Sequence, residues 1–250
     1  MTAAGKVLPI SALLALVLGF LCPEAPAVAL PQSAKPQIEQ SSFVSKGKPI
    51  TVEWYYADDR LAKTPIIIIL HGSGGVGQFF RDLASPLCKS GSHVMVVHYF
   101  DQNDLDTASS ADMARHFNTW LKTVGASIDY AARQPFVDSN NISLLGHSLG
   151  AELALHTAAR DHRISSVIDM AGCFVLPTAK IKRMPPVLIL HGKLDKVVPL
   201  NREKTLKAVL ERTGTKYEEH IFTRGDHAFD NVSFSEIISL CTNFLNQHRN

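Results

Sequence analysis

The sequence lacks the concentrated positive charge that marks most nucleic-acid-binding proteins. Its formal net charge is only +2, and no long run of like charge occurs. The densest basic stretch is Lys180, Lys182 and Arg183, with Lys193 beyond it. Such a stretch is typical of a solvated loop, whereas nucleic-acid binding usually needs a basic patch or stripe. We therefore expect no nucleic-acid partner.

Cysteine is also scarce. Only four are present, and one of them, Cys22, lies in the N-terminal segment. The other three are Cys88, Cys173 and Cys241, none of which is part of a C-x-x-C pair or lies near a histidine at zinc-ligand spacing, so no metal site is expected. Three cysteines cannot all pair within one chain, so at most one disulfide is expected, and three buried thiols are the alternative.

No apolar run is long enough to cross a bilayer comfortably. The longest N-terminal run covers residues 10–21, whereas a spanning helix needs about 20 apolar residues. Lys6 precedes this run, and Ala27-Val28-Ala29 follows it, which is the three-part pattern of a secretory signal peptide. We predict a signal peptide over residues 1–29, a single catalytic domain over 30–250, and a secreted or periplasmic protein without stable membrane insertion. An uncleaved anchor and a lipid-modified Cys22 are the alternatives.

What the sequence does contain is an alternation of strand-like and helix-like patterns. Apolar residues make up 46% of the chain and charged residues 19%, as in globular proteins, and no repeat or low-complexity segment occurs. Short apolar or alternating runs predict strands. These runs cover residues 38–44, 50–56, 66–70, 94–97, 142–145, 167–170, 187–190 and 216–222.

Helical spacing of apolar residues fills the intervals between these runs. The predicted helices cover residues 113–131 and 149–160, a segment that follows Asn201, and a C-terminal segment that follows Ser233. Asn201 is a candidate cap of the third helix, and Ser233 with Glu236 has the spacing of a capping box. Strands that alternate with helices predict an α/β fold with a parallel sheet covered on both faces.

The sequence Gly146-His147-Ser148-Leu149-Gly150 stands between a predicted buried strand and a predicted helix. In this context a G-x-S-x-G string indicates a nucleophile elbow, in which a sharp turn exposes the serine and bulky neighbours would collide. The helix N-terminus also favours a developing negative charge. Ser148 is therefore the candidate nucleophile; an ordinary strand-to-helix turn is the alternative.

A serine hydroxyl needs a base that takes its proton, and the base needs an orienting carboxylate. Of eleven histidines, His227 follows the last predicted strand, where an open α/β sheet places its site. Asp195 follows the strand before it and gives the chain order Ser, Asp, His. Asp226 is adjacent to His227 in sequence and poorly placed, and Asp169 is the alternative acid.

Glycine-rich sequence after the strand at 66–70 offers donors for an oxyanion. The backbone N–H of Leu149 and one from Gly72 or Ser73 are the expected pair. Gly72, Gly74 and Gly77 also satisfy G-x-G-x-x-G, and Asp101 ends the next strand, as a dinucleotide-binding fold requires. That alternative leaves Ser148, Asp195 and His227 unexplained, and an exported protein has little access to nicotinamide cofactors.

Four motifs in this order resemble the α/β-hydrolase superfamily, and within it the dienelactone-hydrolase-like group. They are HGSGG at 71–75, GHSLG at 146–150, PPVLILHGKLDKVVP at 185–199 and GDHAF at 225–229. The resemblance implies an α/β-hydrolase fold with a mostly parallel eight-stranded sheet, and a Ser148, Asp195, His227 triad. Dienelactone hydrolases proper carry cysteine in the elbow, so Ser148 moves the expectation towards general esterases. The short segment between 170 and 187 leaves no room for a lid domain.

These features together predict a serine hydrolase that cleaves an ester-like bond, a carboxylic ester or a lactone, of a small molecule through an acyl-enzyme. We expect no cofactor. Phe79, Tyr99 and Phe174 are candidate substrate-binding residues beside the site, where Phe80 also lies. For at least two of these four aromatic residues, packing in the core is the better expectation. A non-catalytic binding protein on the same fold and an acyltransferase with the same triad are the alternatives.

Overall fold

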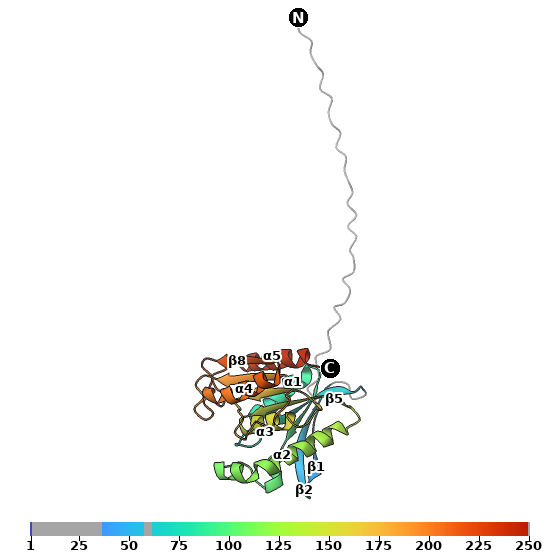
Figure 1. The fold of residues 1–250 in the computed structure, drawn as a ribbon. Coiled ribbons are helices and arrows are strands. Elements are labelled where there is room, and N and C mark those ends of the chain that lie inside the picture. The colour runs from blue at the N-terminus through green and yellow to red at the C-terminus, as the bar shows by residue number, and fades with distance from the viewer. Residues whose placement is uncertain (2–36, 58–61, 250) are drawn as a thin grey trace, which may run out of the picture. The chain divides into compact units, whose positions relative to one another are not determined.

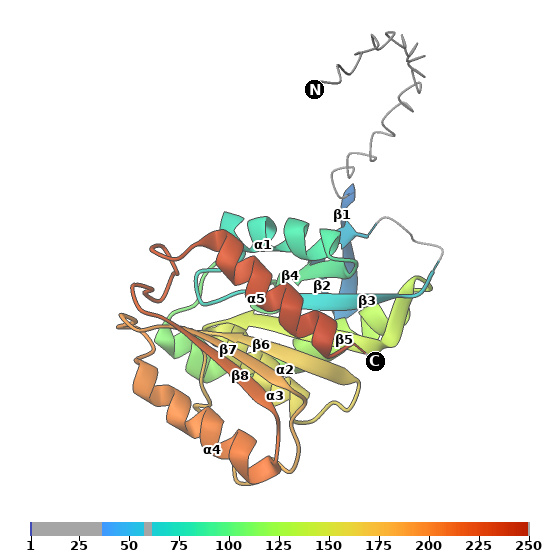
Figure 2. The ribbon, with the colours of Figure 1, turned by 90° about the horizontal axis from the view of Figure 1, so that it is seen from above.

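The predicted strands form a single eight-stranded sheet. The computed structural model describes Met1, residues 37–57 and residues 62–249. The strands are β1 (Gln37–Ser45), β2 (Lys48–Tyr56), β3 (Thr64–Leu70), β4 (His93–Val97), β5 (Val137–His147), β6 (Ile164–Met170), β7 (Val187–Gly192) and β8 (Tyr217–Phe222). Their spatial order is β1-β2-β4-β3-β5-β6-β7-β8. Figure 1 shows the fold coloured along the chain, and Figure 2 labels all eight strands of the sheet.

The sheet is antiparallel at one edge and parallel elsewhere. β1 pairs with β2, and β2 with β4, in antiparallel register, and all the other neighbours are parallel. Lys46 and Gly47 join β1 to β2 with φ of 48° and 80°, as a tight hairpin turn requires. The central parallel strands, among them β3 and β4, are buried on both faces, which explains why their sequences are continuous apolar runs rather than alternating ones.

Helices cover the two faces of the sheet in different numbers. They are α1 (Gln78–Lys89), α2 (Ser110–Ala132), α3 (Leu149–Ala158), α4 (Glu203–Thr213) and α5 (Phe234–Gln247), with short 3-10 turns η1 (Tyr99–Asn103) and η2 (Leu200–Arg202). α2, α3 and α4 pack on one face, against Ile66 and Ile68 among others. α1 and α5 pack on the other, against Ile67 and Ile69, and lie over the sheet in Figure 2.

Two of the predicted helix starts are wrong in detail. Asn201 lies inside η2, and α4 begins at Glu203 without a side-chain cap. Ser233 does stand at the N-cap of α5, but its hydroxyl pairs with the hydroxyl of Ser235 at 2.9 Å instead of closing a capping box. A capping box does form at the start of α2, between Ser109 and Asp112, where the sequence analysis expected none.

The α/β-hydrolase architecture with a mostly parallel sheet is confirmed. Residues 171–186, all of which are described, contain no helix or strand, so no lid domain covers the sheet there. Within the described ranges, no helix has the length and apolar character needed to cross a membrane. Cys173 and Cys241 are buried free thiols, and Cys88 is buried too. The predicted signal peptide falls in residues outside the description.

Candidate active site

Ser148 stands at the sharp turn between β5 and α3. Its φ is 53° and its ψ is −118°, a conformation that residues other than glycine rarely adopt. A side chain at Gly146 would place its Cβ 2.3 Å from the carbonyl oxygen of Gly150, and one at Gly150 would lie 2.2 Å from that of Leu70. The turn therefore needs both glycines. The Ser148 backbone N–H donates to the Met170 carbonyl at 2.9 Å, which fixes the turn to β6.

The structure brings Ser148, His227 and Asp195 together in one hydrogen-bonded chain. Ser148 Oγ lies 2.9 Å from His227 Nε2, and His227 Nδ1 lies 2.7 Å from Asp195 Oδ2. Asp195 follows β7 and His227 follows β8, so the carboxyl ends of adjacent parallel strands deliver both side chains. A proton on Nδ1 that is donated to Asp195 leaves Nε2 free to accept from the serine hydroxyl.

Asp195 is held rigidly. Its Oδ1 accepts hydrogen bonds from the backbone N–H groups of Val197 and Val198, both at 2.8 Å. Its side chain has no exposed surface. The two alternative acids lie elsewhere: Asp226 Oδ1 accepts from the Asp230 N–H at 3.2 Å, and Asp169 is fully buried, which raises its pKa to about 7. Asp195 is therefore the carboxylate that faces His227.

His147, next to Ser148, holds the backbone of the base, a role that the sequence analysis missed. Its Nε2–H donates to the His227 carbonyl oxygen at 2.8 Å. Burial lowers the pKa of His147 to about 4, so the ring stays neutral at pH 7. The position before the serine in G-x-S-x-G was the available signal, but sequence alone does not show where the ring points.

The glycine-rich loop lies against Ser148. A Cβ added to Gly72 would lie 3.4 Å from Ser148 Cβ. Gly72 and Ser73 border a hollow of about 250 Å³ that Ser148 and His227 also line. Leu149 begins α3, and the first N–H groups of a helix have no partner within the helix. The residues expected to supply the oxyanion donors, Leu149 and either Gly72 or Ser73, therefore lie beside Ser148.

The neighbouring loop, between η1 and α2, supports this glycine-rich loop. The Ala108 N–H donates to the Ser73 carbonyl at 2.8 Å, and a Cβ at Gly75 would lie 2.2 Å from the carbonyl oxygen of Asp106. Asp101 is engaged as well, because its Oδ2 accepts from the Thr51 N–H at 2.8 Å. These contacts leave Asp101 in a structural role and do not favour the dinucleotide alternative.

Of the three predicted substrate-binding residues, only Phe79 borders the hollow, together with Phe80. Tyr99 is fully buried beneath the loop, where it stacks on His71 with ring centroids 4.1 Å apart and donates to the His71 carbonyl. Phe174 is buried against His156. Tyr99 and Phe174 thus pack in the core, as expected for at least two of the four aromatic residues.

A second hollow also reaches His227. It measures about 830 Å³ and reaches Asp195 as well as His227. Three exposed cationic side chains border it, together with the exposed apolar side chains of the same loop. The cationic residues are Lys193, Lys196 and Arg224, and the apolar ones are Leu194 and Val197. His227 therefore borders both hollows.

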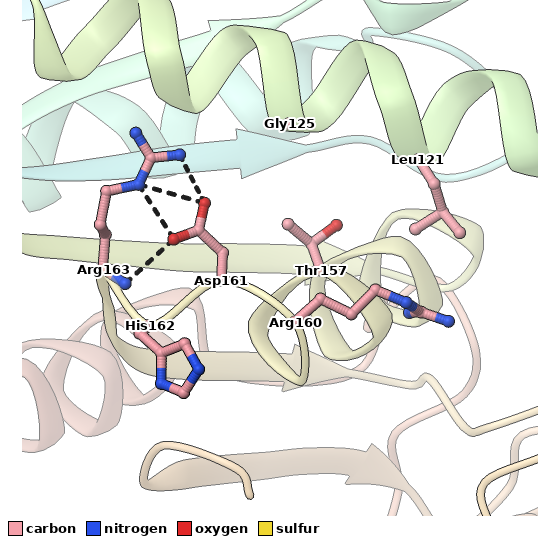
Figure 3. A pocket seen from close by; sticks show the side chains of 7 residues that line it. All are labelled: Leu121, Gly125, Thr157, Arg160, Asp161, His162 and Arg163. Atoms are coloured by element: carbon pink, nitrogen blue, oxygen red, sulfur yellow. Dashed lines mark hydrogen bonds and ion pairs between the residues drawn. The ribbon is translucent and has the colours of Figure 1, made fainter. Parts of the chain in front are cut away.

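Another hollow, of about 500 Å³, is separate from this site. It lies between α2 and the end of α3, and Figure 3 shows its lining. Arg163 beside it is held by Asp161 and Asp129 at 2.6 and 2.8 Å. None of the candidate catalytic residues lines this hollow. Among the described residues, no three His, Cys, Asp or Glu side chains gather in a way that could hold a metal ion.

Comparison with known proteins agrees with this architecture. The Phospholipase/Carboxylesterase family model matches residues 91–248. The chain therefore belongs to this family of α/β hydrolases, and it is a hydrolase. The quorum-quenching protein AidA of Acinetobacter baumannii (strain MDR-ZJ06) is 28% identical over 109 residues, which cover 42% of this chain and only 34% of that relative.

Two solved structures share the fold at low sequence identity. A dienelactone hydrolase-like promiscuous phosphotriesterase from metagenomic libraries has a TM-score of 0.75 at 14% identity, over 86% of this chain and 100% of its own. Thermogutta terrifontis esterase 2, phosphoramylated by tabun, has a TM-score of 0.69 at 18% identity, over 85% of this chain and 95% of its own. The dienelactone-hydrolase-like fold is confirmed.

Proposed function

We propose that this hydrolase is a serine esterase that cleaves a carboxylic ester or lactone of a small molecule through an acyl-enzyme. The hydrogen-bonded chain from Ser148 through His227 to the buried carboxylate of Asp195 carries the proposal. A serine in an ordinary strand-to-helix turn would need neither the positive φ nor a base at 2.9 Å.

In the first step Ser148 Oγ attacks the ester carbonyl while His227 Nε2 takes its proton. Asp195 stabilises the imidazolium that forms and keeps its Nδ1–H in place. The oxyanion is held by the N–H groups of Leu149 and of Gly72 or Ser73. His227 then gives its proton to the leaving alkoxide, and the acyl-enzyme remains.

Water completes the reaction. It enters the space that the alcohol has left, His227 removes its proton, and the resulting hydroxide attacks the acyl carbonyl. The tetrahedral intermediate collapses, Ser148 regains its proton from His227, and the acid is released. An acyltransferase would use an alcohol in place of water here, so product analysis with added alcohols separates the two.

The deciding experiment is mass spectrometry after treatment with a fluorophosphonate, which modifies activated serines. We expect one adduct, on Ser148, and its loss in His227→Ala. His162→Ala is the matched control, because His162 is exposed beside the separate hollow. Phosphoramylation of the Thermogutta terrifontis esterase by tabun supports the choice of probe. Folded protein without an adduct would contradict the proposal and favour a binding protein.

A further inference from the structure

A second histidine lies behind the triad acid and has no part in the reaction as described so far. His191 stands at the end of β7 and is fully buried. Its Nε2 lies 3.2 Å from Asp195 Oδ2, the same oxygen that contacts His227, and 2.8 Å from the Val198 carbonyl oxygen. Its Nδ1 lies 2.8 Å from Oε1 of Glu203, at the start of α4.

The contacts decide which protons His191 carries. A carbonyl oxygen has no proton, so Nε2 donates its single hydrogen to Val198 and faces Asp195 Oδ2 at 3.2 Å as a charged neighbour. On the other side, burial lowers the pKa of His191, but Glu203 and Val198 raise it further, and the net pKa is above the usual value. Burial raises the pKa of Glu203, while the contact with His191 brings it below its usual value. Both directions, together with the 2.8 Å separation of Nδ1 and Oε1, favour an ion pair between His191 and Glu203.

Other charged groups complete this buried cluster. Asp169 on β6 faces His191, and its pKa, raised to about 7 by burial, leaves it only partly charged. Lys207 on α4 lies 3.4 Å from Glu203 Oε2 and also contacts Glu219 on β8. The positive end of the His191–Glu203 pair therefore points to Asp195, and its negative end is compensated by Lys207.

We propose that His191 and Glu203 form a buried positioning pair that holds the Asp195 carboxylate ionised and oriented towards His227. The proposal rests on the proposed function, because it concerns the same base. Asp195 is then held at both oxygens: Oδ1 accepts from two backbone N–H groups, and Oδ2 lies 2.7 Å from His227 Nδ1 and 3.2 Å from His191 Nε2. A carboxylate so held cannot rotate away when His227 becomes charged.

The pair also affects how easily His227 takes a proton. The His191 cation is nearer to His227 than the Glu203 anion is, because Asp195 contacts both rings. In Glu203→Gln the carboxylate that stabilises the charged form of His191 is removed. His191 then becomes neutral, so the variant loses the His191 cation together with the Glu203 anion. His227 should then become more basic, since a nearby like charge lowers the pKa of a cationic acid. The acid limb of the pH profile reports this group.

The experiment measures kcat/KM against pH for a chromogenic ester, together with the rate of fluorophosphonate labelling. For Glu203→Gln we expect the acid limb to move up by about 0.5 to 1 pH unit. We expect kcat at neutral pH to fall about tenfold to a hundredfold, as for other residues that orient a functional group, with KM little changed. His191→Gln should shift the limb in the same direction.

A double variant and a control sharpen the result. If the two residues act as a unit, His191→Gln combined with Glu203→Gln should match Glu203→Gln alone rather than add to it. Glu211→Gln is the control, because it removes an exposed carboxylate from the same helix and leaves His191, Glu203 and Lys207 in place, and its acid limb should not move. Circular dichroism checks that each variant is folded.

The outcomes separate this inference from the proposed function. Wild-type protein that is folded yet neither labelled nor active overturns the proposed function, and the inference falls with it. Labelled, active wild-type protein together with an unshifted acid limb in folded Glu203→Gln overturns the inference alone. A Glu203→Gln variant that is less stable but whose acid limb does not shift also overturns the inference, because it shows that the pair has only a structural role.

Discussion

Ser148 occupies a backbone conformation that costs energy in every residue with a side chain. Its φ of 53° and ψ of −118° are imposed by the bond to Met170 and by the close approach of Gly150 to Leu70. Such conformations cost about 1 to 3 kcal/mol and persist where the surrounding structure fixes them. In this chain the turn directs the hydroxyl out of the sheet towards His227.

Two substitutions at Ser148 should separate strain from chemistry. Both Ser148→Ala and Ser148→Gly should lose ester hydrolysis by several powers of ten, but only glycine relieves the strain. The greater conformational entropy of glycine in the unfolded chain offsets part of the relieved strain. Ser148→Gly should still be more stable than Ser148→Ala by about 1 kcal/mol, which corresponds to about 2 to 4 °C in Tm. Thermal unfolding measures the difference. Equal Tm values would show that the turn is unstrained.

Among individual residues, the sequence predicted those whose position is set by the strand that precedes them. Ser148 directly follows β5, and Asp195 and His227 lie in the loops after β7 and β8, so the parallel sheet brings all three to one edge. Tyr99 and Phe174 follow strands too, but the sequence does not show whether such a side chain turns to the surface or to the core. The roles of His147 and His191 were not predicted for a similar reason, because they depend on contacts with segments distant in the sequence.

Helix α1 is tied to the sheet by a partly buried cluster around Glu53. Arg81 of α1 donates to both oxygens of Glu53 on β2, and His98 after β4 lies 2.9 Å from the same carboxylate. Burial raises the pKa of Glu53, but the bonds from His98 and Arg81 lower it further, to about 2. Because α1 follows the glycine-rich loop, this cluster also fixes the loop beside Ser148.

Glu53→Gln should therefore change how stability depends on pH. Since the folded-state pKa is about 2 and the ordinary value is 4.5, the contribution is fully present above about pH 4.5 and is lost as pH falls through 2. At neutral pH the variant should lose about 2 to 3 kcal/mol of unfolding free energy. Urea unfolding at several pH values measures this. A difference that stays constant from pH 7 to 2 would contradict it.

Elements were predicted better than their ends. Every strand was recognised. The central parallel strands gave the clearest signal, because both of their faces are apolar, whereas the edge strand β8 is only partly buried. The capping pattern at Ser233 did not form, while Ser109 and Asp112 do form one. A cap needs a particular backbone geometry as well as the right residue types, and that geometry depends on how the preceding loop packs.

For the whole molecule, export remains a proposal, because residues 2–36 lie outside the described part. We expect the chain made in a bacterial host to be cleaved after Ala29 and to leave the cytoplasm. N-terminal sequencing of the exported protein should begin at Leu30. A full-length chain that stays in the membrane fraction would favour an uncleaved anchor. A variant with Ala27 and Ala29 both replaced by bulky residues is the control, and it should block cleavage.

The short connection over residues 171–186 has a consequence for the physical state of the substrate. An esterase with a mobile cover gains activity when an oil–water interface stabilises its open form. This connection contains no helix or strand that could form such a cover. Rates with a short-chain ester should follow simple saturation with dissolved monomers, without a jump at the critical micelle concentration. Ester turnover measured across that concentration tests this, and the protein should work on molecules that are singly dispersed in water.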